Sequence, residues 1–249
     1  GAERVVANLL NGLDRSRYDV RLVLMNNEIE YVIPEGLPIH YIEQSNRYEN
    51  EYLKFVKLPL LAYRFARYCQ SEKIDLVLSV MNRPNLIATM ARRFGLKSKV
   101  LISERCYSPF TYNKETISGR IKLWLLKKHY PLADAILPNS QGTAEALEKI
   151  YGIHTPYQVV RNPTDVAGIR EKARLPVEAD IDFSRFTFIY AATFRPEKNQ
   201  RMLIEAADAL RDYPFQLLLI GKGELLNEMK SLVAERRLGD KIRFIDFTN

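Results

Sequence analysis

The sequence has few residues of the kinds that build disulfides or metal sites. It contains two cysteines, Cys69 and Cys106, which do not form a Cys-x-x-Cys pair. We therefore expect no disulfide framework, and the composition fits a reducing compartment. The three histidines, His40, His129 and His154, show no spacing typical of a metal-binding pair. The sequence thus predicts no metal site.

Long apolar runs, internal repeats and low-complexity segments are missing as well. No apolar run reaches about 18 residues, the length needed to cross a bilayer, and no secretory signal is visible. What is present is a globular composition, since 47% of the 249 residues are hydrophobic and 27% are charged. This length suits one large domain or two small ones. We expect a cytoplasmic protein.

Basic residues outnumber acidic ones, and the excess lies early in the chain. The formal net charge is +7, and residues 1–165 carry 23 Lys and Arg against 17 Asp and Glu. A basic surface favours an anionic partner such as a membrane, a phosphorylated substrate or nucleic acid, although ordinary surface lysines would give the same charge. A nucleic-acid-binding module is the weakest of these readings, because the sequence lacks a helix-turn-helix, zinc spacing or an aromatic RNA-binding strand.

Strand patterns alternate with amphipathic helix patterns along the whole chain. The expected strands are residues 18–25, 39–42, 74–80, 99–103, 133–138, 157–160, 188–192, 215–220 and 241–247. The expected helices include residues 1–13, 52–71, 84–94, 115–130, 202–210 and 225–238. This alternation predicts an α/β fold in which helices cover both faces of parallel sheets.

The chain divides into two expected units, residues 1–165 and 166–249, each Rossmann-like. Residues 161–165 are expected to connect the two units. Residues 166–185 lack periodicity and fit a linker or insertion. A glycine turn before a first helix normally follows a strand, so we expect the first unit to lack its first strand. The second unit, with about three strands, is expected to be incomplete.

Two basic loops follow neighbouring strands of the second unit. Residues 193–199 follow one strand, and the turn at residues 221–224 ends the next. Open α/β sheets bind ligands at the carboxyl ends of their strands. Arg195, Lys198 and Lys222, with a glycine-flanked backbone and a helix N-terminus, would suit a diphosphate. The alternative is a solvated basic loop beside an ordinary glycine turn.

Six short segments are informative because of their order. They are residues 1–6, 102–105, 135–140, 160–165, 196–199 and 219–224. Together they resemble the motifs of family 4 glycosyltransferases, which have the GT-B fold, and in particular those of bacterial polysaccharide and lipid-linked glycan synthesis. The resemblance implies a retaining enzyme that moves a sugar from a nucleotide-sugar bound by the second unit to an acceptor bound by the first.

The resemblance also implies roles for individual residues. Lys198 is the expected catalytic residue, assisted by Arg195, because positive charge must stabilise the departing diphosphate. The residues implied in donor binding are Gly1, Ala2, Thr193, Lys198, Gly221, Lys222 and Gly223. Glu104 and Arg105 are implied in acceptor binding, with a strand-end ion pair or solvated loop as the alternative. We expect a UDP-sugar donor, a glycan or lipid-linked acceptor, and neither metal nor cofactor.

The sequence departs from the family pattern at several points. The strand before the first helix and the donor-side Glu-x₇-Glu motif are missing, so the chain resembles a fragment that we expect to be inactive alone. Thr193 stands where the family often has Arg, Ala192 where it has Gly, and Glu224 where it has Pro. Another GT-B enzyme, such as a nucleotide-sugar 2-epimerase, remains the alternative, although the histidines suit it poorly.

Two helices mix basic residues with apolar ones. Residues 52–71 and 115–130 combine Lys and Arg with Leu, Phe and Trp, a composition that suits a surface in contact with an anionic membrane. Such a surface would place the protein on the inner face of the cell membrane. Core-packing helices with a solvated basic edge would have the same composition.

Overall fold

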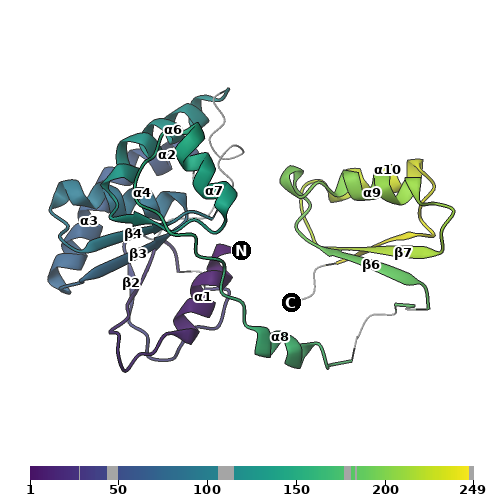
Figure 1. The fold of residues 1–249 in the computed structure, drawn as a ribbon, viewed down its shortest axis with the longest axis horizontal. Helices are drawn as coiled ribbons and strands as arrows, with labels where there is room; N and C mark the ends of the chain where they lie inside the picture. Colours follow the sequence, from purple (N-terminus) through teal and green to yellow (C-terminus); the bar gives the residue numbers. More distant parts are fainter. Residues whose placement is uncertain (28, 44–49, 106–114, 177–180, 183, 247–249) are drawn as a thin grey trace. The chain divides into compact units, whose positions relative to one another are not determined.

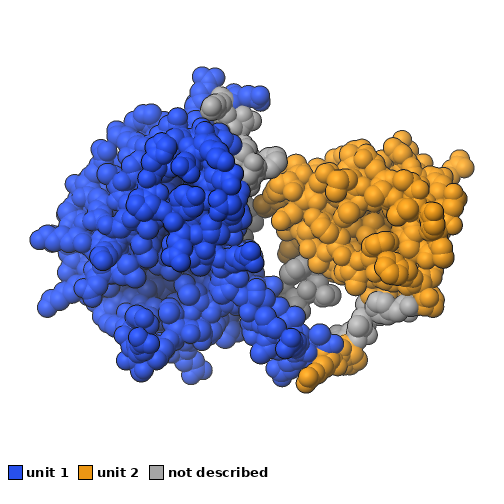
Figure 2. Space-filling model, in the orientation of Figure 1, with its two compact units in different colours: residues 1–173 blue, residues 174–249 orange. Residues whose placement is uncertain are grey.

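A computed structural model describes the chain except for residues 28, 44–49, 106–114, 177–180, 183 and 247–249. The chain forms two compact units, which we call the first unit (residues 1–173) and the second unit (residues 174–249) (Figure 2). Cys106, the second of the two cysteines, lies outside the described residues.

The first unit is built from parallel strands and the helices that connect them (Figure 1). Its strands are β1 (Leu22–Leu24), β2 (Ile39–Tyr41), β3 (Leu76–Val80), β4 (Lys99–Ser103) and β5 (Ala135–Ile136). Strands β1 and β2 form one parallel pair, and β3, β4 and β5 form a three-stranded parallel sheet in that order.

The helices of the first unit surround an apolar core. They are α1 (Ala2–Gly12), α2 (Glu51–Val56), α3 (Leu58–Ser71), α4 (Asn82–Ala91), η1 (Arg92–Phe94), α6 (Ile117–His129), η2 (Tyr130–Leu132), α7 (Gln141–Glu145), η3 (Ala146–Ile150) and α8 (Val166–Lys172). Helix α4 contacts β3 and β4, and α3 and α6 pack against α4. Leu61, Leu86, Ile102 and Leu126 are among the most deeply buried side chains of this core.

The second unit is a smaller parallel sheet with two helices on one side (Figure 1). Its elements are β6 (Phe186–Ala191), η4 (Pro196–Lys198), α9 (Gln200–Ala209), β7 (Phe215–Ile220), α10 (Leu226–Glu235) and β8 (Ile242–Ile245). The strand order is β6–β7–β8. Leu217 and Leu219 of β7 pack with Ile204 of α9 and Met229 of α10 to form its core.

Several predicted elements differ from the observed ones. The helix expected at residues 52–71 is interrupted at Lys57, and Pro59 lies in the first turn of α3, where its missing N–H costs no helical hydrogen bond. The strand expected at 18–25 is reduced to the three residues of β1. Residues 157–160 form only an isolated bridge, through Tyr157, beside β5. The backbone there is paired nevertheless, since Gln158 N and Val160 N donate to Ile136 O and Pro138 O.

Residues 166–185, expected to be an irregular linker, contain a helix. Helix α8 begins after Asp165, whose Oδ1 accepts a hydrogen bond of 2.9 Å from Gly168 N. No residue of α8 is buried, and its two large apolar residues, Val166 and Ile169, are exposed. The segment before it is tied to the first unit, because Asn8 Nδ2 of α1 donates to Pro163 O. The compact units divide after Ala173, so that α8 falls in the first unit, whereas the sequence placed the division after Asp165.

Candidate functional site

The two basic loops of the second unit lie against each other, as the sequence predicted. Phe194 N, in the loop after β6, donates to Lys222 O in the turn after β7 at 3.0 Å. Leu225 N donates back to Phe194 O at 3.2 Å. Phe194 is itself buried, with 1% of its surface exposed. The loop and the turn are therefore one backbone-bonded structure at the carboxyl ends of β6 and β7.

Glycine is required in the turn because the neighbouring backbone leaves no room for a side chain. A Cβ on Gly221 would lie 2.1 Å from Ala192 O, and a Cβ on Gly223 would lie 2.5 Å from Phe194 O. Both glycines also have a positive φ, +147° and +155°, which other residues rarely adopt. The two glycines thus allow the loops to approach each other closely.

The remaining candidate side chains project from this structure. Thr193, Arg195, Lys198 and Lys222 are all exposed. The backbone that carries them is held in place, because Tyr190 Oη donates to Lys198 O at 2.9 Å. At the other end, the buried side chain of Gln200 donates through Nε2 to Thr193 O at 2.9 Å.

Helix α9 starts directly beside these cations. It begins at Gln200 after Asn199, which adopts the left-handed conformation with φ of 48°, and no side-chain cap bonds to its first N–H groups. Unsatisfied N–H groups at a helix N-terminus attract anions. Three cations, one helix N-terminus and a hydroxyl therefore gather at one end of the second unit, an arrangement that can bind a diphosphate.

Glu104 and Arg105 follow β4 in the first unit, and their environments differ sharply. Only 1% of Glu104 is exposed, and its Oε2 accepts a 2.6 Å hydrogen bond from Tyr130 Oη. Asn85, also fully buried, donates to Ser103 O at 3.0 Å and to Tyr130 Oη at 3.3 Å. The carboxylate of Glu104 is thus held in a buried network at the end of the strand.

Arg105 is directed towards the segment that leads out of the first unit. Its Nη1 donates to Asn162 Oδ1 and approaches Val160 O, and Asn139 Nδ2 donates to Arg105 O. Burial lowers the pKa of the Arg105 guanidinium below its usual value. Arg105 therefore links the end of β4 to residues 160–162.

Gly1 and Ala2, the other implied donor-binding residues, lie at the start of α1 in the first unit. Gly1 is exposed and precedes the helix without a side-chain cap. Among the described residues, no group of three or more His, Cys, Asp or Glu side chains is placed to hold a metal ion. Within the same part of the chain, we find no helix with the length and apolar character needed to cross a membrane.

Comparison with known protein families identifies both parts of the chain. The model for Glycosyltransferase Family 4 matches residues 1–167, and the model for Glycosyl transferases group 1 matches residues 172–249. The chain belongs to glycosyltransferase family 4. The resemblance noted in the sequence is therefore confirmed.

Individual relatives agree with this assignment. A Campylobacter jejuni enzyme named N-acetylgalactosamine-N,N'-diacetylbacillosaminyl-diphospho-undecaprenol 4-alpha-N-acetylgalactosaminyltransferase is 36% identical over 250 residues, which cover 100% of this chain and 67% of the enzyme. The Anabaena protein HepE in complex with UDP-glucose is 15% identical, with a TM-score of 0.66, and the match covers 100% of this chain and 66% of HepE. Sucrose-phosphate synthase from Thermosynechococcus elongatus is 17% identical, also with a TM-score of 0.66, over 92% of this chain and 59% of that one.

The structural relatives are too distant in sequence to show more than the fold, and they confirm the predicted α/β architecture of parallel sheets in the manner of GT-B enzymes. This glycosyltransferase chain spans 59% to 67% of the length of the three relatives.

The sequence identified the exposed groups of the candidate site but missed those that hold them. Lys198, Arg195 and the Gly-Lys-Gly turn were selected by their spacing. Tyr190, Gln200, Asn85 and Tyr130 were not, although they fix the loop after β6 and the carboxylate of Glu104. Nothing in the local spacing of these four residues marks them.

Proposed function

We propose that the protein containing this chain transfers a sugar, with retention, from a nucleotide-sugar to a glycan carried on a polyprenyl diphosphate. The observation that supports this most strongly is the 36% identity, over the whole chain, to an enzyme whose named acceptor is a diphospho-undecaprenol-linked saccharide. The distant relative HepE, described with UDP-glucose, supports UDP as the nucleotide. The activity is proposed for the whole protein, since the chain spans 67% of that enzyme.

The proposed chemistry needs positive charge at the leaving group. The bond between the anomeric carbon and the β-phosphate oxygen breaks, a bond from that carbon to an acceptor hydroxyl oxygen forms, and the hydroxyl proton passes to the departing diphosphate. Negative charge develops on the departing diphosphate. Lys198 and Arg195 would stabilise it, with Lys222, Thr193 and the N-terminus of α9 binding the phosphates. Gly221 and Gly223 would let the turn that carries Lys222 lie close to the loop after β6, so that both can contact the phosphates.

The first unit would bind the acceptor under this proposal. Arg105 could contact the acceptor diphosphate or a sugar hydroxyl, and the buried Glu104 would hold the end of β4 in place through Tyr130. Gly1 and Ala2 would contribute backbone N–H groups to the donor phosphates. A polyprenyl-linked acceptor would place the reaction at a membrane, and the low cysteine content suits its cytoplasmic side.

Replacing Lys198 with alanine tests the proposal. We expect kcat to fall about 100- to 1,000-fold, the loss seen when one preorganised charge-stabilising donor is removed. Lys172→Ala, which removes an exposed lysine from α8, serves as the control and should leave kcat unchanged. Normal turnover and normal donor affinity in Lys198→Ala would remove the proposed role.

The same assay separates transfer from the alternative reaction. Release of the nucleoside diphosphate should depend on added acceptor, and the sugar should appear on the acceptor. A nucleotide-sugar 2-epimerase would instead change the sugar with no acceptor present, and that outcome would contradict the proposed transfer.

A further inference from the structure

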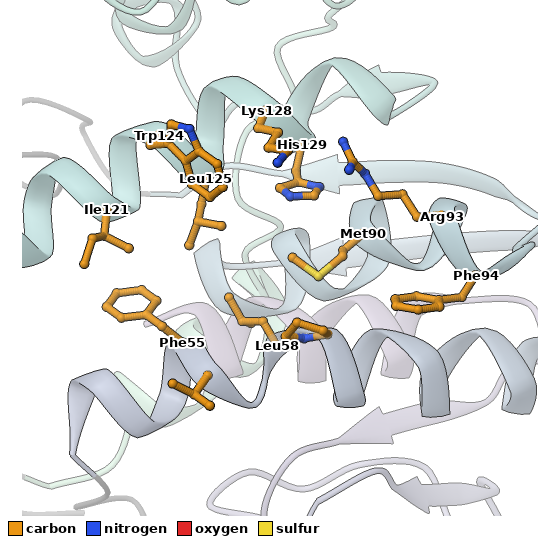
Figure 3. Close-up of a pocket in the computed structure, with 12 residues that line it drawn as sticks. Phe55, Leu58, Met90, Arg93, Phe94, Ile121, Trp124, Leu125, Lys128 and His129 are labelled. Atoms are coloured by element: carbon orange, nitrogen blue, oxygen red, sulfur yellow. The ribbon is translucent and has the colours of Figure 1, made fainter.

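An apolar groove crosses the surface of the first unit between α2 and α3 on one side and α6 on the other (Figure 3). Its volume is about 470 Å³. Its apolar lining comprises Phe55, Leu58, Met90, Phe94, Ile121 and Leu125. The groove lies apart in sequence from every residue implied in sugar transfer.

Large apolar side chains at the groove are exposed to water. Val56 at the end of α2 is 75% exposed, and Trp124 of α6 is 57% exposed. Phe94 of η1, which also lines the groove, is 38% exposed. Single exposed apolar residues are normal, but several around one apolar depression mark an interaction surface.

The helices around the groove carry mostly positive charge, and Glu51 at the start of α2 is the one acidic residue in them. The sequences of α3, α4, η1 and α6 contain Lys and Arg but no Asp or Glu. Two of these cations, Arg93 and Lys128, line the groove itself, and Lys128 Nζ lies 4.4 Å from the centre of the Trp124 ring. The surface is therefore apolar in its centre and basic at its edge, which is the pattern of side chains that enter an anionic membrane interface.

We propose that this groove docks the first unit on a bilayer of anionic phospholipids. Trp124 and Val56 enter the interfacial region of the lipid, and Arg93 and Lys128 contact lipid phosphates. Tryptophan suits this depth because its ring is apolar and its N–H is polar. The inference deepens the proposed function, since a membrane-linked acceptor would be reached from this surface, but docking itself requires neither donor nor acceptor.

Trp124 is the one tryptophan of the chain, so its fluorescence reports on the groove directly. We expect its emission to shift to shorter wavelength when vesicles containing phosphatidylglycerol are added, and brominated phospholipids to quench it. Vesicles of phosphatidylcholine alone should give a much smaller change. No shift with anionic vesicles at low salt, or an equal shift with both compositions, would overturn the proposal.

Vesicle flotation with variants tests the two parts of the surface. Arg93→Glu with Lys128→Glu should lower partition at least about tenfold, because each basic residue near an anionic surface contributes to binding. Lys97→Glu with Lys172→Glu changes the net charge equally at exposed positions outside the groove and should have little effect. Val56→Ser should weaken partition more than Met202→Ser, which alters a residue of the second unit that is 56% exposed.

Two further outcomes would count against docking on lipid. Equal losses in the groove variants and their controls would show a general charge effect. A tryptophan shift that follows protein concentration without vesicles, together with dimers in light scattering, would assign the groove to a second copy of the chain. Circular dichroism of each variant distinguishes lost docking from lost folding, and the result is independent of whether the protein transfers sugar.

Discussion

Gly221 lets two loops of the candidate donor site approach each other because glycine has no Cβ. An added Cβ would meet the carbonyl oxygen of Ala192, a backbone atom that cannot rotate away. We expect Gly221→Ala to destabilise the second unit by about 2–4 kcal/mol, through strain at its positive φ and displacement of the loop after β6. Denaturant unfolding measures the loss.

Gly239→Ala provides the matched control for Gly221→Ala. Nothing lies within 4 Å of a Cβ added at Gly239. The change should therefore be neutral or slightly stabilising, because alanine restricts the unfolded chain. Equal losses of stability in the two variants would contradict the close approach of the two loops.

His129, at the C-terminal end of α6, is predicted to make stability depend on pH. It is 3% exposed, and its pKa is lowered to about 4, first by burial and then by the nearby charges of Arg93 and Lys128. The unfolded chain binds this proton near pH 6.5, whereas the folded chain does not. The stabilisation is therefore complete above pH 6.5 and is lost as the pH falls towards 4, by at most about 3 kcal/mol.

Unfolding free energies measured between pH 7 and 4.5 test this expectation. Carboxylates titrate in the same range, so the informative quantity is the difference between the wild type and His129→Gln. The variant should show a shallower fall in stability, whereas His154→Gln, at an exposed position, should follow the wild type. Parallel curves for wild type and His129→Gln would show that His129 does not carry the dependence.

At the residue scale, the sequence predicted only those residues of the candidate site that follow a recognisable strand. Lys198 and Gly221 follow strand patterns, and the carboxyl ends of neighbouring parallel strands must lie together. The bond from Tyr130 to Glu104 joins residues 26 positions apart, and that from Asn85 to Tyr130 joins residues 45 apart. No local pattern encodes such pairs, because they depend on how α4 and η2 pack beside the end of β4.

At the scale of elements, the sheet of the second unit shows what periodicity cannot distinguish. The sequence presents β6 and β7 alike, as two apolar strands. Strand β7, in the centre, is buried along almost its whole length, whereas β6 lies at the edge and exposes Phe186, Phe188 and Ile189. Position in the sheet, and not composition, determines the burial of each strand.

Alanine substitutions in the two strands should reveal this difference. Leu219→Ala in β7 removes a fully buried side chain from the core formed with α9 and α10, and should cost about 2–5 kcal/mol. Ile189→Ala in β6 alters a side chain that is 58% exposed and should cost well under half as much. Thermal or denaturant unfolding compares the two. Similar costs would mean that β6 is covered in solution.

Other elements show why boundaries are less predictable than element type. The long helix expected at 52–71 was recognised, but it is divided at Lys57 into α2 and α3, with Pro59 in the first turn of α3. Helix α8 was missed although Asp165, a residue type that often caps helices, precedes Val166 and Ile169 at helical spacing. The helix has only 7 residues, too few to show a full apolar stripe.

At the scale of the whole molecule, the alternation of strands and helices was sufficient to predict the α/β class. Short strands alternate with helices that are apolar on one face. Such helices pack on a sheet when the strands they connect are parallel. The division between units was less accessible to sequence. The expected and observed divisions differ only in residues 166–173, most of which form α8, a helix with no buried residue.

The two proposals make different demands on the acceptor, and one experiment with two acceptors distinguishes them. With a polyprenyl-linked acceptor in anionic vesicles, Arg93→Glu with Lys128→Glu should reduce transfer about tenfold, in step with lost membrane partition. Added salt should do the same to the wild type, because screening weakens surface attraction. With a water-soluble, short-chain acceptor analogue, the same double variant should keep its kcat and KM, since no residue that lines the groove belongs to the candidate donor loops. Lys198→Ala should lose activity with both acceptors, because its proposed role is at the leaving diphosphate.

A double variant that fails equally with both acceptors would place Arg93 and Lys128 in the transfer site and not at a lipid surface. A double variant that works equally well with both would leave the groove without a part in reaching the membrane.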